Sequence, residues 1–117
     1  MNFFRRLFNG DAANAEEEHR EQAARDFDVL KYDGVAAMRQ HVFDYAEKCF
    51  LHALDIHDDL EIHDYLSQTF IALGKLPEAI SQLRILADAE PENINIWLRM
   101  ASVAYVMNDY DIMETAC

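Results

Sequence analysis

The chain has 117 residues, a length at which one domain with a single hydrophobic core is expected. Three glycines and two prolines are too few for the many tight turns of an all-β protein, so an all-α fold is favoured. The net charge of −12 argues against nucleic acid as a partner, because phosphates would be repelled, and favours basic peptides or basic protein surfaces.

Residues 1–26 form an N-terminal arm with an amphipathic start and an acidic continuation. In residues 3–8, apolar side chains share one side of a short helix opposite two arginines: Phe3, Phe4, Leu7 and Phe8. Exposed aromatics of this kind mark a contact site, so these four are candidates for self-association. Docking onto the protein or a neighbouring copy, a flexible arm, and a membrane-surface anchor all remain open. Two turns with two arginines bury little, so a membrane anchor is the weakest. Residues 11–26 suit a solvated helix or a flexible linker.

From residue 27 onward, apolar periodicity and helix-end signals predict helices at roughly 27–40, 43–56, 60–73, 77–89, 94–107 and from 110 onward. Pro77 falls in the first turn of a helix, where its missing N–H costs nothing. Pro91 follows a helix end, and Asn93 can cap the next helix. Trp97 is expected in the core, and Tyr110 is expected to pack.

The chain repeats itself at a fixed spacing, which we call the repeat interval. Residues 70–80 align with 104–114, and each segment holds a polar turn residue, Gly74 or Asn108, between two helices. Gly and Asn most readily adopt the left-handed conformation that ends a helix. A third copy, residues 38–47, lies upstream at an offset within one residue of that interval. This self-similarity predicts stacked helix pairs.

These segments resemble the tetratricopeptide repeat, a helix–turn–helix unit with a period of about 34 residues. The middle repeat matches its favoured positions with His63, Leu66, Ser67, Phe70, Gly74, Leu76, Ala79, Leu83, Leu86 and Pro91. The third matches with Trp97, Met100, Ala101, Ala104, Asn108, Tyr110, Met113 and Cys117. The first matches with Leu30, Gly34, Ala37, Phe43, Ala46, Phe50 and Ala53, and departs at Asp33 and Asp58. The resemblance implies a right-handed superhelical stack of antiparallel helix pairs, an α-solenoid, with repeats at 27–59, 60–93 and 94–117, the last incomplete. Small residues at 34, 46, 67, 79 and 101 fit closely crossing helices.

The resemblance also implies a concave groove that binds a peptide or protein segment. Its candidate residues are Asp28, Lys31, Val35, Met38, Glu61, Asp64, Gln68, Ile71, Asn95, Leu98, Ser102 and Tyr105. They suggest an apolar floor beside an acidic wall of Asp28, Glu61 and Asp64, complementary to a segment with apolar anchors and a Lys or Arg. The alternative is that they are only the solvated inner face of a scaffold.

No pattern predicts catalysis, a metal site or a cofactor. His57 and His63 flank three acidic residues, but the spacing of the two histidines does not bring them to one point, and acids at a helix start are explained by the helix dipole. Cys49 is expected to be an apolar packing residue, and neither cysteine belongs to a close pair, so reduced thiols and a cytoplasmic location are expected.

The sequence therefore predicts a protein- or peptide-binding adaptor rather than an enzyme. The alternative is a self-associating scaffold, a homodimer formed through the N-terminal arm or an open C-terminal face. The chain stops about halfway through the second helix of the third repeat. We therefore expect either a fragment of a longer chain or an open face covered by a second copy or a partner.

Overall fold

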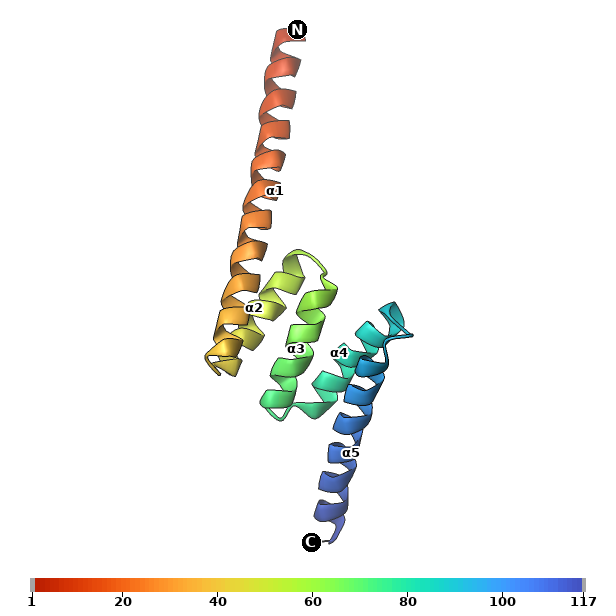
Figure 1. The fold of residues 1–117 in the computed structure, drawn as a ribbon. Helices are drawn as coiled ribbons and strands as arrows, with labels where there is room; N and C mark the ends of the chain where they lie inside the picture. Colours follow the sequence, from red (N-terminus) through yellow and green to blue (C-terminus); the bar gives the residue numbers. More distant parts are fainter. Residues whose placement is uncertain (1, 117) are drawn as a thin grey trace.

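The computed structural model describes the backbone of residues 2–116 and the side chains of residues 13–108. Within that backbone the chain forms five α-helices and no strand: α1 Asn2–Arg39, α2 Phe43–Ile56, α3 Leu60–Ala72, α4 Leu76–Ala89 and α5 Ile94–Ala116. Each helix packs against the next one in the chain, and α1 also contacts α3 (Figure 1). The all-α class is confirmed, and the helices expected at 43–56, 60–73 and 77–89 agree with α2, α3 and α4 to within one residue.

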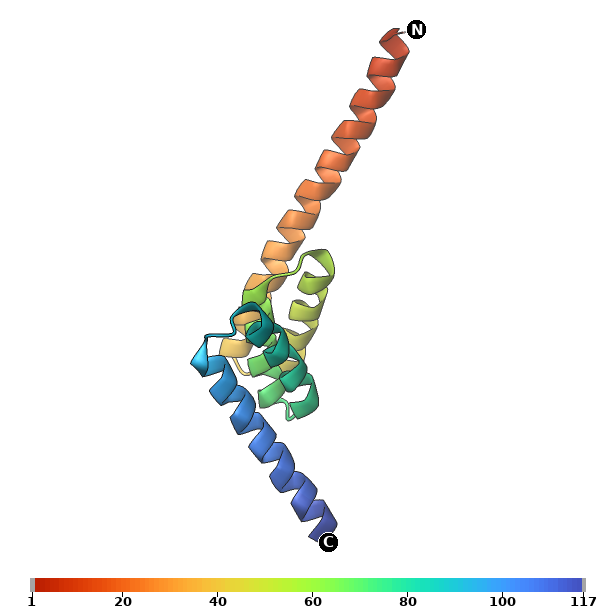
Figure 2. The same ribbon diagram turned by 90° about the vertical axis from the view of Figure 1, so that its right-hand side faces the viewer.

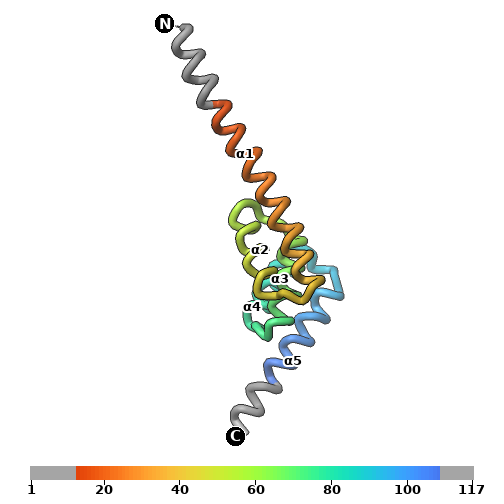
Figure 3. The backbone as a smooth tube through the Cα atoms, turned by 90° about the vertical axis from the view of Figure 1, so that its left-hand side faces the viewer, coloured from red at the N-terminus to blue at the C-terminus, as the bar shows by residue number. Residues whose placement is uncertain are grey.

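Helix α1 is longer than expected. Its 38 residues run from the N-terminal arm into the first helix pair without a break between residues 26 and 27. A helix of that length spans about 57 Å. Side chains 13–22 are all exposed, and this part of α1 extends away from the other helices, so the molecule measures 79 × 31 × 24 Å (Figures 1 and 3). Of the two expectations for residues 11–26, the solvated helix is the one observed.

Two tight turns with the same backbone hydrogen bonds end α1 and α3. Gly74 has φ 75°, and its N–H donates to the Ile71 carbonyl at 3.0 Å. The N–H of Lys75 donates to the Phe70 carbonyl at 2.8 Å. This pair of bonds is the Schellman motif, which satisfies the free carbonyls at a helix end. The same two bonds recur one repeat interval earlier, to within one residue, around His41, which has φ 60° although it is not a glycine. The predicted left-handed turn at Gly74 is confirmed.

The starts of α3 and α5 are also alike. The side chain of Asp59 caps α3, because its Oδ1 accepts from the N–H of Glu61 at 2.8 Å and of Ile62 at 3.2 Å. At the corresponding place one repeat interval later, Asn93 Oδ1 accepts from the N–H of Asn95 at 3.1 Å. The capping role expected of Asn93 is therefore confirmed.

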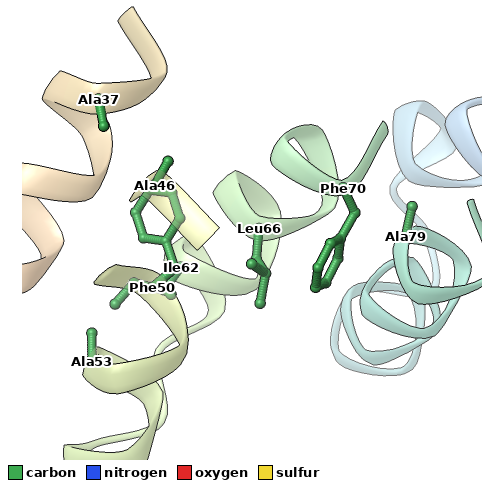
Figure 4. Packing of buried hydrophobic residues seen from close by; sticks show 8 residues of the cluster. All are labelled: Ala37, Ala46, Phe50, Ala53, Ile62, Leu66, Phe70 and Ala79. Atoms are coloured by element: carbon green, nitrogen blue, oxygen red, sulfur yellow. The ribbon is translucent and has the colours of Figure 1, made fainter. Parts of the chain in front are cut away.

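The main core lies between α1, α2, α3 and the start of α4 (Figure 4). It contains Ala37, Ala46, Phe50, Ala53, Ile62, Leu66, Phe70 and Ala79. Of the small residues expected at helix crossings, those at 34, 46, 67 and 79 are buried, whereas Ala101 on α5 is exposed. The Phe50 ring stacks on Tyr65 with ring centroids 5.7 Å apart. A second, smaller cluster joins α4 to α5 and contains Leu83, Leu86, Ala87, Ile96 and Val103.

Helix α5 differs from the two helices expected there. The turn predicted at Asn108 is wrong, since α5 continues through it to Ala116. Trp97, expected in the core, is 48% exposed, and its indole N–H donates to the Pro91 carbonyl at 2.8 Å. Both differences have one physical cause: within the described residues no further helix folds back to cover that side of α5. Tyr110, expected to pack, lies outside the side chains that are described.

Candidate interaction groove

The candidate groove residues lie on α1, α3 and α5, and none of them is buried. Five are half-buried: Lys31, Val35, Met38, Asp64 and Ile71. Seven are exposed: Asp28, Glu61, Gln68, Asn95, Leu98, Ser102 and Tyr105. The self-association candidates Phe3, Phe4, Leu7 and Phe8 lie outside the described side chains.

An ion-pair cluster joins α1 to the start of α3. Lys31 Nζ lies 3.0 Å from Asp59 Oδ2 and 3.5 Å from Glu61 Oε1. Burial disfavours the charge on Lys31, but the hydrogen bond and negative charge of Asp59 outweigh that cost, so the pKa of Lys31 is raised. The hydroxyl of Tyr65 also donates to Glu61 Oε1, at 3.1 Å.

A second cluster joins α5 to the middle of α3. Arg99 Nη1 donates to Asp64 Oδ1 at 2.6 Å, and the same nitrogen lies 3.4 Å from Ser67 Oγ. Gln68 Nε2 donates to the same Asp64 oxygen at 3.1 Å. These contacts fix the position of α5 relative to α3 at one point along its length.

The ion pairs change the expected electrostatics of this face. The sequence suggests an acidic wall of Asp28, Glu61 and Asp64, but two of those carboxylates are paired with bases of the chain itself. Asp28 has no ion pair among the described contacts. The three carboxylates of the expected acidic wall lie on this face, and the ion pairs offset part of the charge of two of them.

An apolar hollow of about 630 Å³ opens between the α3–α4 turn and α5. It is lined by Ile71, Gly74, Leu76, Pro77, Arg99, Ser102, Val103, Val106 and Met107. Gly74 contributes no side chain at the turn, and the later part of α5 runs away from the other helices (Figure 2). The volume falls within the range of ordinary ligand pockets, roughly 300–1000 Å³, and its lining fits large apolar side chains.

A second hollow of about 490 Å³ lies along the exposed side of α1. Its lining is more polar and includes both charges and an aromatic ring: Asp28, Lys31, Tyr32, Val35, Ala36, Arg39 and Gln40. Three residues expected in the groove, Asp28, Lys31 and Val35, are brought together here.

The expected groove residues and the lining of the two hollows overlap only in part. Ile71 and Ser102 line the apolar hollow as expected of groove residues, whereas Leu98 and Tyr105 line neither hollow and face outward. Sequence reasoning missed the contribution of Leu76, Pro77, Val103 and Met107. The Leu-Pro pair that starts two residues after the turn glycine is the signal that could have indicated an apolar rim beside an open turn.

The cluster around His63 serves the fold. The ring is buried, with Nδ1 lying 2.6 Å from Gln82 Oε1 and Nε2 lying 2.6 Å from Asp58 Oδ1. These contacts tie the start of α3 to α4 and to the preceding turn. His57, by contrast, is exposed, and its ring packs edge-on against Phe27 at a centroid distance of 5.6 Å.

Other chemistry is sparse in the part of the chain that is described. Cys49 is buried, and burial raises the pKa of its thiol despite a hydrogen bond with Tyr45 that lowers it. Among residues whose side chains are described, no three His, Cys, Asp or Glu side chains converge as metal ligands. No helix in the described part combines the length and apolar character needed to cross a membrane.

Comparison of the chain with protein-family models, with curated proteins and with solved structures found no match.

Proposed function

We propose that the chain is a helical-repeat protein of tetratricopeptide type that binds a peptide or protein segment on the face shared by α1, α3 and α5. In this proposal the helix pairs form a right-handed superhelical stack, and the first helix of each pair contributes to a concave surface.

Recurrence of local structure at the repeat interval supports the repeat assignment. The helix-capping side chains Asp59 and Asn93 are one interval apart, and the Schellman turns at His41 and Gly74 are one interval apart to within one residue. Ala46 and Ala79, which are both fully buried, show the same separation to within one residue. Helix ends and crossings at one spacing are expected when a single structural unit is repeated.

The 630 Å³ hollow beside α5 is the observation that carries the binding function. Its walls are mainly apolar, and it opens on the side where Arg99 and Asp64 join α5 to α3. A monomeric protein gains nothing from leaving such a surface in water, because burying it would stabilise the fold by about 25 cal/mol per Å². A guest side chain would gain that free energy instead.

The chemistry of the guest follows from the apolar hollow and the net charge. A large apolar side chain fits the hollow beside α5. A basic residue is attracted by the net charge of −12. We therefore propose a segment with an apolar anchor and at least one Lys or Arg, bound as an extended strand or a helix.

Selection from a random peptide library displayed on phage, with the full chain as bait, tests this function. Enriched peptides are then measured by fluorescence polarisation against the wild type and two matched variants. Val106→Glu places a charge in the hollow at a half-exposed position, and Ile85→Glu makes the same change on the outer helix α4. We expect the hollow variant to weaken binding at least ~10-fold, equivalent to about 1.4 kcal/mol, and the α4 variant to leave it unchanged.

Two outcomes would count against the function. One is a selection that yields no enriched peptide over bait-free wells. The other is an enriched peptide whose affinity is the same for Val106→Glu as for the wild type, since that peptide binds somewhere else.

A further inference from the structure

Helix α5 carries an uncovered apolar face along its outer side. Ile94 is 70% exposed, Leu98 is 60% exposed and Tyr105 is 69% exposed, and Ala101 between them is exposed as well. These four recur at spacings of four, three and four positions, which puts them in one row along a helix. Trp97, partly exposed, flanks the row. We call Ile94, Leu98, Ala101 and Tyr105 the α5 seam.

One seam position, Ala101, corresponds to positions that a helix covers in the rest of the chain. Ser67 on α3, one repeat interval before Ala101, and Gly34 on α1, two intervals before it to within one residue, are both buried. The counterparts of the other three seam residues on α3 are exposed or half-buried: Leu60, Asp64 and Ile71. Phe70 on α3 is likewise buried, whereas its counterpart on α5, Ala104, is exposed. Helix α2 covers α1 and helix α4 covers α3, but in the described structure no helix covers this side of α5 (Figures 1 and 2). The seam therefore has, at Ala101, the small residue that a crossing helix needs, without that helix.

Charge indicates which partner fits the seam. The chain carries −12, so two copies repel each other over most of their surfaces. Between residues 94 and 108 the only charged residue is Arg99, and its guanidinium is held by Asp64 on the inner side. The seam is thus a surface where two copies can meet without opposing like charges. A basic partner, which the rest of the chain attracts, would find no acid to pair with on the seam.

We propose that two copies of the chain associate through the α5 seam, with the two α5 helices crossing at Ala101. The small side chain at the crossing lets the helix axes approach to about 8–10 Å. Leu98 and Tyr105 on either side then pack between side chains of the other copy, and the contact is self-complementary about a two-fold axis. Ile94 and Trp97 at the edges add to the apolar surface that the contact buries, and a specific interface needs roughly 1000 Å² in total.

A short crossing contact between the two α5 helices, rather than a long parallel pairing, also keeps apart the acidic residues on either side of the seam. Glu92 precedes α5, and Asp109 and Asp111 follow the seam in the sequence. Helices that cross at an angle carry their ends apart, so these acids of the two copies do not come together. The pairing leaves the hollow accessible, because its α5 lining, Ser102 and Val106 included, lies on another side of that helix. The pairing and the peptide-binding function can therefore fail separately.

Sedimentation velocity of the full chain from about 1 to 200 μM tests the pairing. We expect the mass to rise with concentration from 13.6 kDa to twice that value. Leu98→Glu on the seam should weaken dimerisation at least tenfold, and Ile85→Glu, an equally accessible apolar position on α4, should leave it unchanged. Both substituted side chains are exposed, so neither change disturbs the core. Acrylamide quenching of Trp97, the single tryptophan, should decrease as the dimer forms.

Disulfide trapping locates the contact. In a Cys117→Ser background, in which the other native cysteine Cys49 is buried, Ala101→Cys should give a covalent dimer on mild oxidation, and Asp88→Cys on α4 should not. A chain that remains monomeric at the highest concentration would overturn the proposal. A dimer that Leu98→Glu does not weaken, or that Ala101→Cys does not trap, would overturn it as well, because its contact lies on another surface.

Discussion

One added methyl group at Gly34 tests how closely α1 and α2 pack. A Cβ atom at this position would lie 2.5 Å from Cε1 of Phe50 and 2.8 Å from both Cδ1 and Cζ. Carbon atoms in ordinary contact are about 3.5–4.0 Å apart, so the ring would have to retreat by about 1 Å. Phe50 is fully buried and stacks on Tyr65, which leaves it no free space to move into. The new methyl group therefore strains the core.

Two opposing effects decide the size of the change. Overpacking a core typically costs ~1–3 kcal/mol. Replacing glycine by alanine inside a helix stabilises it by ~1 kcal/mol. We therefore expect Gly34→Ala to lower the free energy of unfolding by up to ~2 kcal/mol, instead of raising it as helix propensity alone predicts.

A double-mutant cycle with Phe50→Leu separates the two effects. Leucine removes the ring carbons that the new methyl group would meet, so in that background Gly34→Ala should be neutral or stabilising by up to ~1 kcal/mol. The measurement is equilibrium urea unfolding followed by far-UV circular dichroism. If Gly34→Ala stabilises the wild type, or if its effect is the same in both backgrounds, the packing argument is refuted.

Gly74 supplies a matched control for the conformational role of glycine. A Cβ atom at Gly74 would meet nothing within 4 Å, but its φ of 75° is unfavourable for alanine. Gly74→Ala should therefore cost ~1–2 kcal/mol through backbone strain alone. Gly74→Asn should cost less, since asparagine tolerates this conformation. At Gly34 asparagine should be worse than alanine, because the limit there is space.

Three further changes test the rest of the fold by urea unfolding or thiol labelling. Asp59→Ala removes the cap of α3 and should cost ~1–2 kcal/mol. Burial alone would raise the pKa of Asp59, but hydrogen bonds from Lys31 and from the start of α3 hold that pKa below 3.8. The resulting stabilisation is present above pH 3.8 and is lost as the pH falls through the folded-state pKa, so the variant should lose less stability over that range. In a Cys117→Ser background, Cys49 should react with a thiol reagent only after unfolding, and rapid labelling of the native chain would contradict its burial. Ala79→Leu, at a fully buried crossing, should cost ~1–3 kcal/mol, whereas Ala72→Leu at an exposed position should cost little.

The sequence was most informative where local signals and packing agree. The bounds of α2, α3 and α4 follow from an apolar stripe and from turn residues such as Gly74 and Asp59, which act within a few residues. Residues 11–26 contain good helix formers and no proline but show no apolar stripe. Propensity therefore allowed a helix there without requiring one. At Asn108 the turn was inferred from its alignment with Gly74. In the described structure no folded-back helix is present to stabilise such a turn, and α5 continues.

The candidate site was predictable at the level of helices but not of side-chain contacts. The repeat register placed Lys31 and Asp64 on an accessible face, and the structure agrees. It did not predict that Lys31 reaches Asp59, or that Arg99 reaches Asp64, because those contacts span 28 and 35 residues and depend on how neighbouring helices are inclined. The hollow beside α5 likewise depends on the angle at which α5 leaves α3. That angle is set by side chains from several elements together.

The placement of positive charge links the fold to both proposed contacts. Three bases each pair with an acid of another element: Lys31, Lys75 and Arg99. Such partly exposed pairs contribute only ~0–1 kcal/mol each to the free energy of unfolding, so they orient the helices more than they stabilise the fold. Because these bases are paired within the chain, the outer surface is strongly acidic, while the α5 seam has no unpaired charge.

The two proposed contacts should therefore respond oppositely to salt. Raising NaCl from about 50 to about 500 mM shortens the screening length from more than about 10 Å to less than about 8 Å. Weaker attraction should reduce the affinity for a basic peptide. Weaker repulsion should strengthen the pairing of two acidic copies. A dimer that dissociates as salt is raised would instead be held by charges, and the uncharged α5 seam could not be its contact.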